Sequence, residues 1–133
     1  MQSNLNIWNF LHDGCIVGLS GQCPGEVSLK VEIEYICKVL DSDSKFLWLN
    51  LHSCSSLFYA PFNNSDVVTD LVQLEKLELE ILKAKETGKD TVICCTEGIL
   101  SVNYLDVTCT LNNGVLVSLS TLFQASKKYW DDW

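Results

Sequence analysis

The clearest pattern in this chain is a strict alternation of apolar and polar residues in its first third. Positions 27–35 read VSLKVEIEY, so every second residue is apolar and the residues between are polar. Successive side chains of a strand point to opposite faces, and this period therefore predicts a strand with one buried and one solvent-facing side. One-sided burial of this kind is typical of an antiparallel sheet that is covered on one face.

Other segments with a strand pattern lie between turn residues: 14–20, 46–52, 57–60, 91–96, 99–104, 107–111 and 115–117. Pro24-Gly25 suits a tight turn before position 27, so the first four strands are expected to form a meander. Asn112-Asn113-Gly114 is a strong hairpin signal. The short steps between consecutive strands indicate mainly antiparallel pairing.

Two helices are predicted from capping residues and helix formers. Asn63 to Asp66 can cap a helix start, and the residues that follow favour one long helix that runs to Thr87. Ser118 or Ser120 can cap a short C-terminal helix. The order of elements predicts a single α+β domain over residues 1–133, with both helices packed on a mostly antiparallel sheet of about six to eight strands.

The charge of the chain limits what it can bind. It carries nine lysines, no arginine and seventeen acidic residues, for a formal net charge of -8. Without arginine it has no guanidinium group that could bind phosphate through two hydrogen bonds at once. Its net negative charge also repels a nucleic-acid backbone. We therefore expect no nucleic acid as a partner and expect a basic protein instead, because opposite charge steers association.

The cysteines and the N-terminus bear on the compartment. There are seven cysteines, an odd number, and most of them fall within predicted strands. In a reducing compartment such thiols act as small apolar core residues, so we expect no disulfides. The N-terminus lacks the cationic start and the apolar run of an export signal, and no window approaches a membrane span. These features predict a cytoplasmic protein with no membrane contact.

Familiar signatures of catalysis and metal binding are missing from the sequence. His12, His52 and Cys54 would have to meet through the fold to form a metal site or a thiol–imidazole pair, and no spacing supports such a site. Phosphate-binding loops and nucleophile elbows are absent as well. We therefore predict no metal, no cofactor and no catalytic residue, and expect His12 to make only local hydrogen bonds.

Glu78 is the unusual residue of the predicted long helix. It lies near the middle of the apolar stripe, between Leu74 and Leu82, where an ionised carboxylate needs a partner or a rim position. It could pair with a lysine, or act as a buried acid in a pocket. Three apolar residues beside the stripe could form a second contact surface: Val68, Val72 and Leu79.

Glu32 and Glu34 are candidates for contact with a basic partner. They lie two residues apart in the run 27–35 and are therefore expected on the same solvent-facing side of one strand. Such a carboxylate pair could work as acid and base only if the fold enclosed it. The alternation favours a solvated face instead.

The C-terminal residues form a second candidate surface. Asp131, Asp132 and Trp133 combine carboxylates with an aromatic side chain, and tryptophan is a frequent anchor in protein interfaces. Trp8 and Trp48 could join the same surface.

Two short stretches carry a resemblance to a known class of proteins. This small acidic chain has Leu11-His12-Asp13-Gly14 directly before a predicted hairpin. It has Tyr129-Trp130-Asp131 near its C-terminus. In these features it resembles bacterial immunity proteins of polymorphic toxin systems. The resemblance implies a protein that binds a toxin and blocks its active site, often through acidic groups that face a basic surface.

Together these observations favour a non-enzymatic, acidic protein-binding domain, with an immunity protein as its most specific form. The candidate binding residues are Glu32, Glu34, Glu78, Asp131, Asp132 and Trp133. One alternative is a small enzyme or ligand-binding domain with a pocket between the sheet and the long helix, which would use Glu78, His12 or His52. Another is a structural homodimer formed through a sheet edge or the apolar side of the helix.

Overall fold

The structure is a computed structural model that describes residues 5–40, 44–63, 66–87 and 90–131, with only the backbone described at residues 5, 6 and 129–131. The described helices are α1 (Leu5–Phe10), α2 (Glu34–Val39), α3 (Leu71–Lys76) and α4 (Leu119–Asp131). The strands of the first half are β1 (Cys15–Gly21), β2 (Gly25–Glu32), β3 (Phe46–Cys54), β4 (Ser56–Pro61) and β5 (Leu79–Glu80). Those of the second half are β6 (Lys83–Thr87), β7 (Asp90–Cys94), β8 (Gly98–Asn103), β9 (Asp106–Leu111) and β10 (Leu116–Val117).

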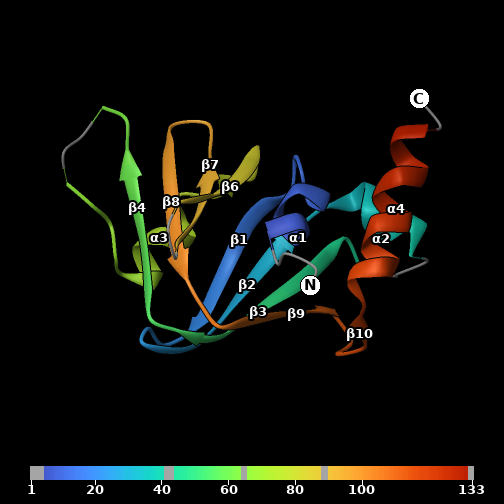
Figure 1. Ribbon diagram of the computed structural model, residues 1–133, viewed down its shortest axis with the longest axis horizontal. Helices are drawn as coiled ribbons and strands as arrows, with labels where there is room; N and C mark the ends of the chain where they lie inside the picture. Colours follow the sequence, from blue (N-terminus) through green and yellow to red (C-terminus); the bar gives the residue numbers. More distant parts are fainter. Residues whose placement is uncertain (1–4, 41–43, 64–65, 88–89, 132–133) are drawn as a thin grey trace.

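The strands form two antiparallel sheets (Figure 1). The larger has six strands in the order β10-β9-β3-β2-β1-β5, and the smaller has four in the order β4-β8-β7-β6. The predicted α+β class and the antiparallel pairing are confirmed. The prediction of one sheet is wrong, because the chain divides its strands between two.

A bent two-stranded ribbon joins the sheets. β3 pairs with β9 in the larger sheet, and the strands adjacent to them in the chain, β4 after β3 and β8 before β9, pair in the smaller one. Both strands turn the corner together, because Ser55 donates its backbone N–H to the Asn103 carbonyl at 2.8 Å and Leu105 donates to the His52 carbonyl at 3.0 Å. Ser53 has a positive φ of 53° at this corner. The expected four-stranded meander therefore ends at β3.

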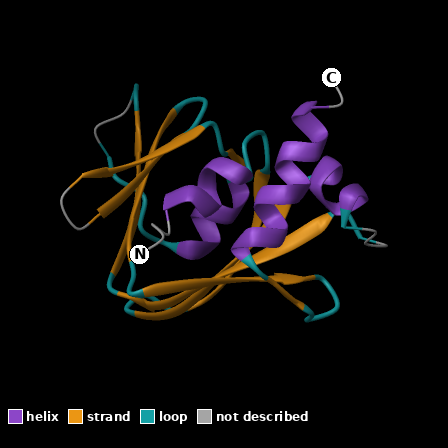
Figure 2. Cartoon of the chain, turned by 45° about the vertical axis from the view of Figure 1, so that its right-hand side comes forward, coloured by secondary structure: helices purple, strands orange, loops and turns teal. Residues whose placement is uncertain are grey.

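The core lies between the larger sheet and the helices and extends to buried residues of the smaller sheet, such as Ile93, Leu100 and Val102. Figure 2 shows α1, α2 and α4 over one side of the larger sheet, where α4 contacts both of the others. On β3, Leu47, Leu49 and Leu51 face inward and are fully buried. α1 packs against β6 and α4, and its Trp8 donates from Nε1 to the Tyr104 hydroxyl at 2.9 Å. Because Trp8 is completely buried, the expectation that it joins a contact surface is wrong.

The predicted long helix from residue 66 to Thr87 does not form. α3 covers only six residues, the chain reverses at Glu78 with a positive φ of 48°, and two strands follow. Asp70 caps α3 by accepting the Val72 N–H at 3.0 Å. β6 pairs with β7 over its whole length, so sheet hydrogen bonds and the burial of Ala84 outweigh the helix propensity of this segment.

Two further helices differ from the sequence expectations. β2 ends at Glu32, so Tyr35 lies in α2 and not in the strand over 27–35, and α1 was not expected at all. The C-terminal helix α4 is confirmed, but with 13 residues it is the longest among the described segments and not a short one. Ser118 is its cap, because its hydroxyl accepts the Thr121 N–H at 3.1 Å.

Candidate functional site

The outward side of the six-stranded sheet carries both aromatic and charged groups. We name it the open face. Its main side chains come from alternate positions of three neighbouring strands: Ser28, Lys30 and Glu32 on β2, Phe46, Trp48, Asn50 and His52 on β3, and Thr108 and Thr110 on β9. All are half-buried. In Figure 2 no described helix lies across this side of the sheet, and α3 only borders it along β1.

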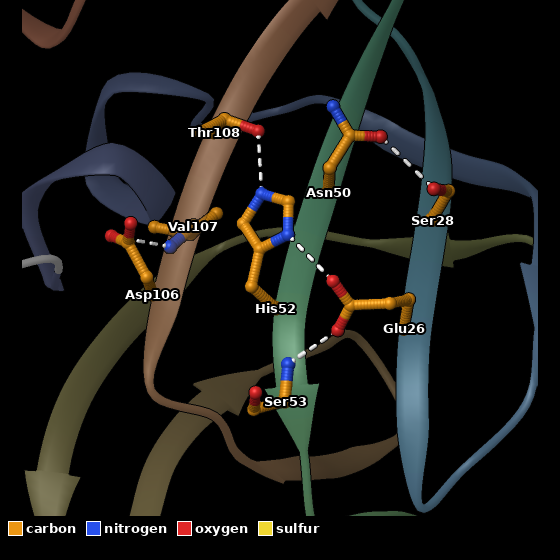
Figure 3. Close-up of polar contacts among 8 residues, drawn as sticks. All are labelled: Glu26, Ser28, Asn50, His52, Ser53, Asp106, Val107 and Thr108. Carbon is orange, nitrogen blue, oxygen red and sulfur yellow. Dashed lines mark hydrogen bonds and ion pairs between the residues drawn. The ribbon is translucent and has the colours of Figure 1, made fainter.

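A polar network occupies one end of the open face (Figure 3). The His52 ring contacts the Glu26 carboxylate through Nδ1 and the Thr108 hydroxyl through Nε2, both at 2.9 Å. Glu26 also accepts the backbone N–H of Ser53. That backbone bond, and then the contact with His52, lower the pKa of Glu26. Both ring nitrogens of His52 are therefore engaged in holding three segments together.

The network continues across β2 and β9. Ser28 donates its hydroxyl proton to Asn50 Oδ1 at 2.9 Å, and Asn50 Nδ2 donates to Thr110 Oγ1 at 3.3 Å. Figure 3 shows Ser28 and Asn50 side by side on the same face as His52. These bonds fix the side chains of the open face in place, which reduces the entropy cost of binding a partner there.

An aromatic cluster lies at the centre of the open face. The Lys30 ammonium lies 4.3 Å from the ring centre of Phe46 and 5.8 Å from that of Trp48. Both distances are within the range of cation–π attraction. Trp48 also donates from Nε1 to Asn112 Oδ1 at 3.1 Å. The rings are half-exposed and oriented, which is the state of an aromatic anchor before binding.

Carboxylates line the side of the open face beside this cluster. Cys15 on β1 is the direct partner of both Glu32 on β2 and Glu80 on β5, so the three side chains share one face. Burial raises the pKa of the Cys15 thiol, and the negative charges of Glu78, Glu32 and Glu80 raise it further. Glu32 has one cationic neighbour, Lys45, at 3.6 Å. We name Glu78, Glu80 and Glu32 the acidic row.

The residues proposed from the sequence have different positions in the fold. Glu32 lies on the open face as expected. Glu34 is exposed but starts α2, so the expected pair of carboxylates on one strand is wrong. Glu78 is exposed in the turn before β5 and is not within a helix stripe, because the long helix does not form. Asp132 and Trp133, like the side chain of Asp131, lie outside the described residues.

The pocket expected for a small enzyme or ligand-binding domain depends on the predicted long helix. The pocket expected between the sheet and a long helix does not form, because the described residues contain no such helix. His12 contacts the Leu82 carbonyl and lies 3.3 Å from Asp13, whereas His52 belongs to the network of Figure 3 and Cys54 is buried. Within the described ranges, no group of three histidine, cysteine or acidic side chains is placed to hold a metal ion.

The expectation of a second contact surface on the long helix is also wrong. Val72 is exposed on α3, whereas Leu79 is buried on β5. Val68 forms an isolated bridge with Tyr59 of β4. The three side chains lie on different elements and share no face.

Several residues of the site were not proposed from the sequence. Phe46 is one of them, and it carries a visible signal because, like the proposed Trp48, it alternates with the buried leucines of the same strand. Glu26 and Glu80 carry none: the role of Glu26 depends on its contact with His52 on the neighbouring strand, and that of Glu80 on the pairing of β1 with the distant β5.

No protein-family model matches this chain, and neither a curated protein nor a solved structure is significantly similar to it. Among the described helices, none combines the length and the apolar character that crossing a membrane requires.

Proposed function

We propose that this chain is a non-enzymatic protein-binding domain that uses the open face to contact a basic protein. One observation carries the proposal: oriented aromatic rings of Phe46 and Trp48 lie beside the acidic row on a sheet face that no described helix covers. Half-exposed aromatic anchors next to a charged rim are typical of protein interfaces.

The net charge of -8 supports a cationic partner. A protein with this excess attracts positively charged surfaces over several ångströms and repels acidic ones. Within the open face, Lys30 lies against the two aromatic rings, so its charge is partly shielded from a partner. The acidic row lies beyond the rings and is available to steer and orient a basic surface.

The most specific form of the proposal is an immunity protein that neutralises a basic toxin. It is supported by the resemblance noted above, by the small acidic fold, and by an open face that offers a surface for covering a toxin. In this role the domain would act in the bacterial cytoplasm and would need no cofactor.

Affinity capture tests the proposal. The full chain, tagged and immobilised, is incubated with lysate of the source cells at about 50 mM and about 500 mM salt, which change the screening length several-fold. We expect a basic protein to be retained at low salt and reduced at high salt. Light scattering of the free chain tests whether the open face instead joins two copies.

Variants then locate the contact. Trp48→Ala should weaken binding by about 2 kcal/mol, or roughly 30-fold, whereas Phe62→Ala, an exposed aromatic outside the open face, should have little effect. Glu32→Gln should weaken capture at low salt more than Glu86→Gln, which makes the same charge change on β6. Failure to retain a basic protein, or retention that Trp48→Ala leaves unchanged, would disprove the proposal.

A further inference from the structure

A hollow of about 230 Å³ lies where the two sheets meet, next to the acidic row. Its walls come from the start of β1, the turn before β5, β4 and the turn between β7 and β8. Three carboxylates line it, Glu78, Glu80 and Glu97, together with the thiol of Cys15 and the hydroxyl of Tyr59. The hollow is therefore strongly negative, and the described lysines contribute nothing to its lining.

The Tyr59 hydroxyl is the feature that distinguishes this hollow from a patch of solvated acids. The side chain is only 4% exposed, yet the described residues provide no hydrogen-bond partner for its oxygen. Every fully buried side-chain nitrogen or oxygen in the described part of the chain has such a partner. The Tyr59 oxygen is therefore not fully enclosed, and because Tyr59 lines the hollow, a ligand there can satisfy it.

The fold makes room for this hydroxyl at Gly98. A Cβ atom at position 98 would lie 2.5 Å from the Tyr59 hydroxyl oxygen, so only glycine allows the ring to occupy its place. Burial raises the pKa of Tyr59, and the neighbouring Cys95 and Glu97 raise it further. The hydroxyl is thus neutral at physiological pH, and its lone pairs are free to accept an N–H donor.

The size and chemistry of the hollow narrow the choice of ligand. It is smaller than the roughly 300–1,000 Å³ of sites for drug-sized molecules, and its carboxylates are not arranged as a metal site in the described chain. A side-chain cation with several N–H donors suits it better, because it can satisfy spaced carboxylates and a hydroxyl together.

We infer that this hollow binds the ammonium or guanidinium group of a lysine or arginine side chain that the partner protein inserts beside the open face. The inference rests on the proposed function, because the hollow and the open face are joined through Glu80, Cys15 and Glu32. A protein that covers Phe46 and Trp48 would reach the hollow along the acidic row.

A small probe tests the hollow without the partner. Isotope-labelled full chain is titrated with N-acetyl-arginine amide and, as the uncharged match, N-acetyl-citrulline amide, while backbone NMR signals are followed. We expect the arginine probe to bind with a dissociation constant of about 1 mM, as for a single side chain, and to shift the amides of Cys15, Glu80, Glu97 and Gly98. The citrulline probe should bind at least about tenfold more weakly because it lacks the charge.

Variants make the test specific. Tyr59→Phe keeps the ring and removes the hydroxyl, and Glu80→Gln keeps the shape and removes the charge. Each should weaken the arginine probe several-fold, while Glu86→Gln on β6 should leave it unchanged. Equal binding of both probes, shifts confined to other regions, or no effect of Tyr59→Phe and Glu80→Gln would overturn the inference.

Failure of this inference is distinguishable from failure of the proposed function. If a basic protein is captured through Trp48 but the arginine probe does not bind the hollow, only the hollow's role is wrong. If the probe binds as expected but no basic protein is captured, the hollow is a cation site and its assignment to a partner's side chain is overturned.

Discussion

Glu26 organises one end of the open face although its own side chain is exposed. It accepts the Ser53 N–H at the corner where the chain leaves the larger sheet, and it contacts the His52 ring on the neighbouring strand. The first of these bonds is the main cause of its lowered pKa. One carboxylate thus links the corner of the bent ribbon to the sheet face.

The lowered pKa leads to a prediction about acid stability. A carboxyl whose pKa is lower in the folded state stabilises the fold above its unfolded pKa of 4.5, and the contribution is lost as the pH falls through the folded value. Glu26→Gln imitates the protonated form. We expect Glu26→Gln to unfold at lower urea concentration than the unmodified chain at pH 7, with the difference disappearing below pH 4.5.

Urea unfolding at several pH values measures this difference. Glu34→Gln is the matched control, because it makes the same charge change at the exposed start of α2. A difference between Glu26→Gln and the unmodified chain that stays constant down to pH 3 would show that the carboxylate charge is not what holds the corner.

At the scale of elements, the segment from α3 to β6 shows how a single residue ends a helix. Leu77 still has right-handed helical geometry, and Glu78 then adopts a left-handed φ of 48°. Glycine is the usual residue in this position because it has no Cβ to clash with the backbone.

This geometry predicts opposite effects of glycine at two positions. Glycine relieves left-handed strain at position 78, so Glu78→Gly should be more stable than Glu78→Ala by about 1 kcal/mol. In the regular strand β6, glycine only adds flexibility, so Glu86→Gly should be less stable than Glu86→Ala. Chemical unfolding of the four variants measures both differences. If glycine were less stable than alanine at position 78 as well, the left-handed backbone geometry of Glu78 would be contradicted.

Alternation was a reliable guide to those strands whose two faces differ. β2, β3 and β9 were predicted because one face of each is buried by the core and the other is half-exposed. The pattern failed at Glu34 and Tyr35, which continue the alternation but belong to α2. The adjacent apolar residues Ile36 and Cys37 break the alternation and mark the change of period.

Residues 79–87 could not be assigned from propensity. Their glutamates, lysines and alanine favour a helix, yet β6 forms because β7 supplies a complete set of hydrogen-bond partners. The same limit applies to the site. Glu32 was predicted to face solvent, but its place in one row with Glu80 arises from strand pairing, and the hollow that Glu80 shares with Tyr59 arises where two sheets meet; one sequence encodes neither locally.

At the scale of the whole molecule, the core is built partly from thiols. Of the seven cysteines, all of them free, Cys37, Cys54, Cys95 and Cys109 are buried. Burial raises the pKa of Cys37 to about 11 and those of the other three to about 12. These thiols act as small apolar residues in the core and depend on remaining neutral.

The thiols therefore predict a loss of stability at high pH. Because their pKa values are higher in the folded state, they stabilise the fold fully below the unfolded pKa of 9.0, and this stabilisation is lost as the pH rises toward about 12. Each thiol contributes a slope of up to about 1.4 kcal/mol per pH unit in that window. The free energy of unfolding, measured in urea from pH 7 to pH 11, should decline accordingly.

Cys109→Ala isolates one thiol. It creates a cavity that lowers stability at pH 7, but it removes a titrating group, so its stability should fall less steeply above pH 9.0 than that of the unmodified chain. Val107→Ala is the matched control, because it creates a cavity in the same strand without changing titration. Its decline with pH should run parallel to that of the unmodified chain. Parallel curves for all three proteins would show that the buried thiols do not determine alkaline stability.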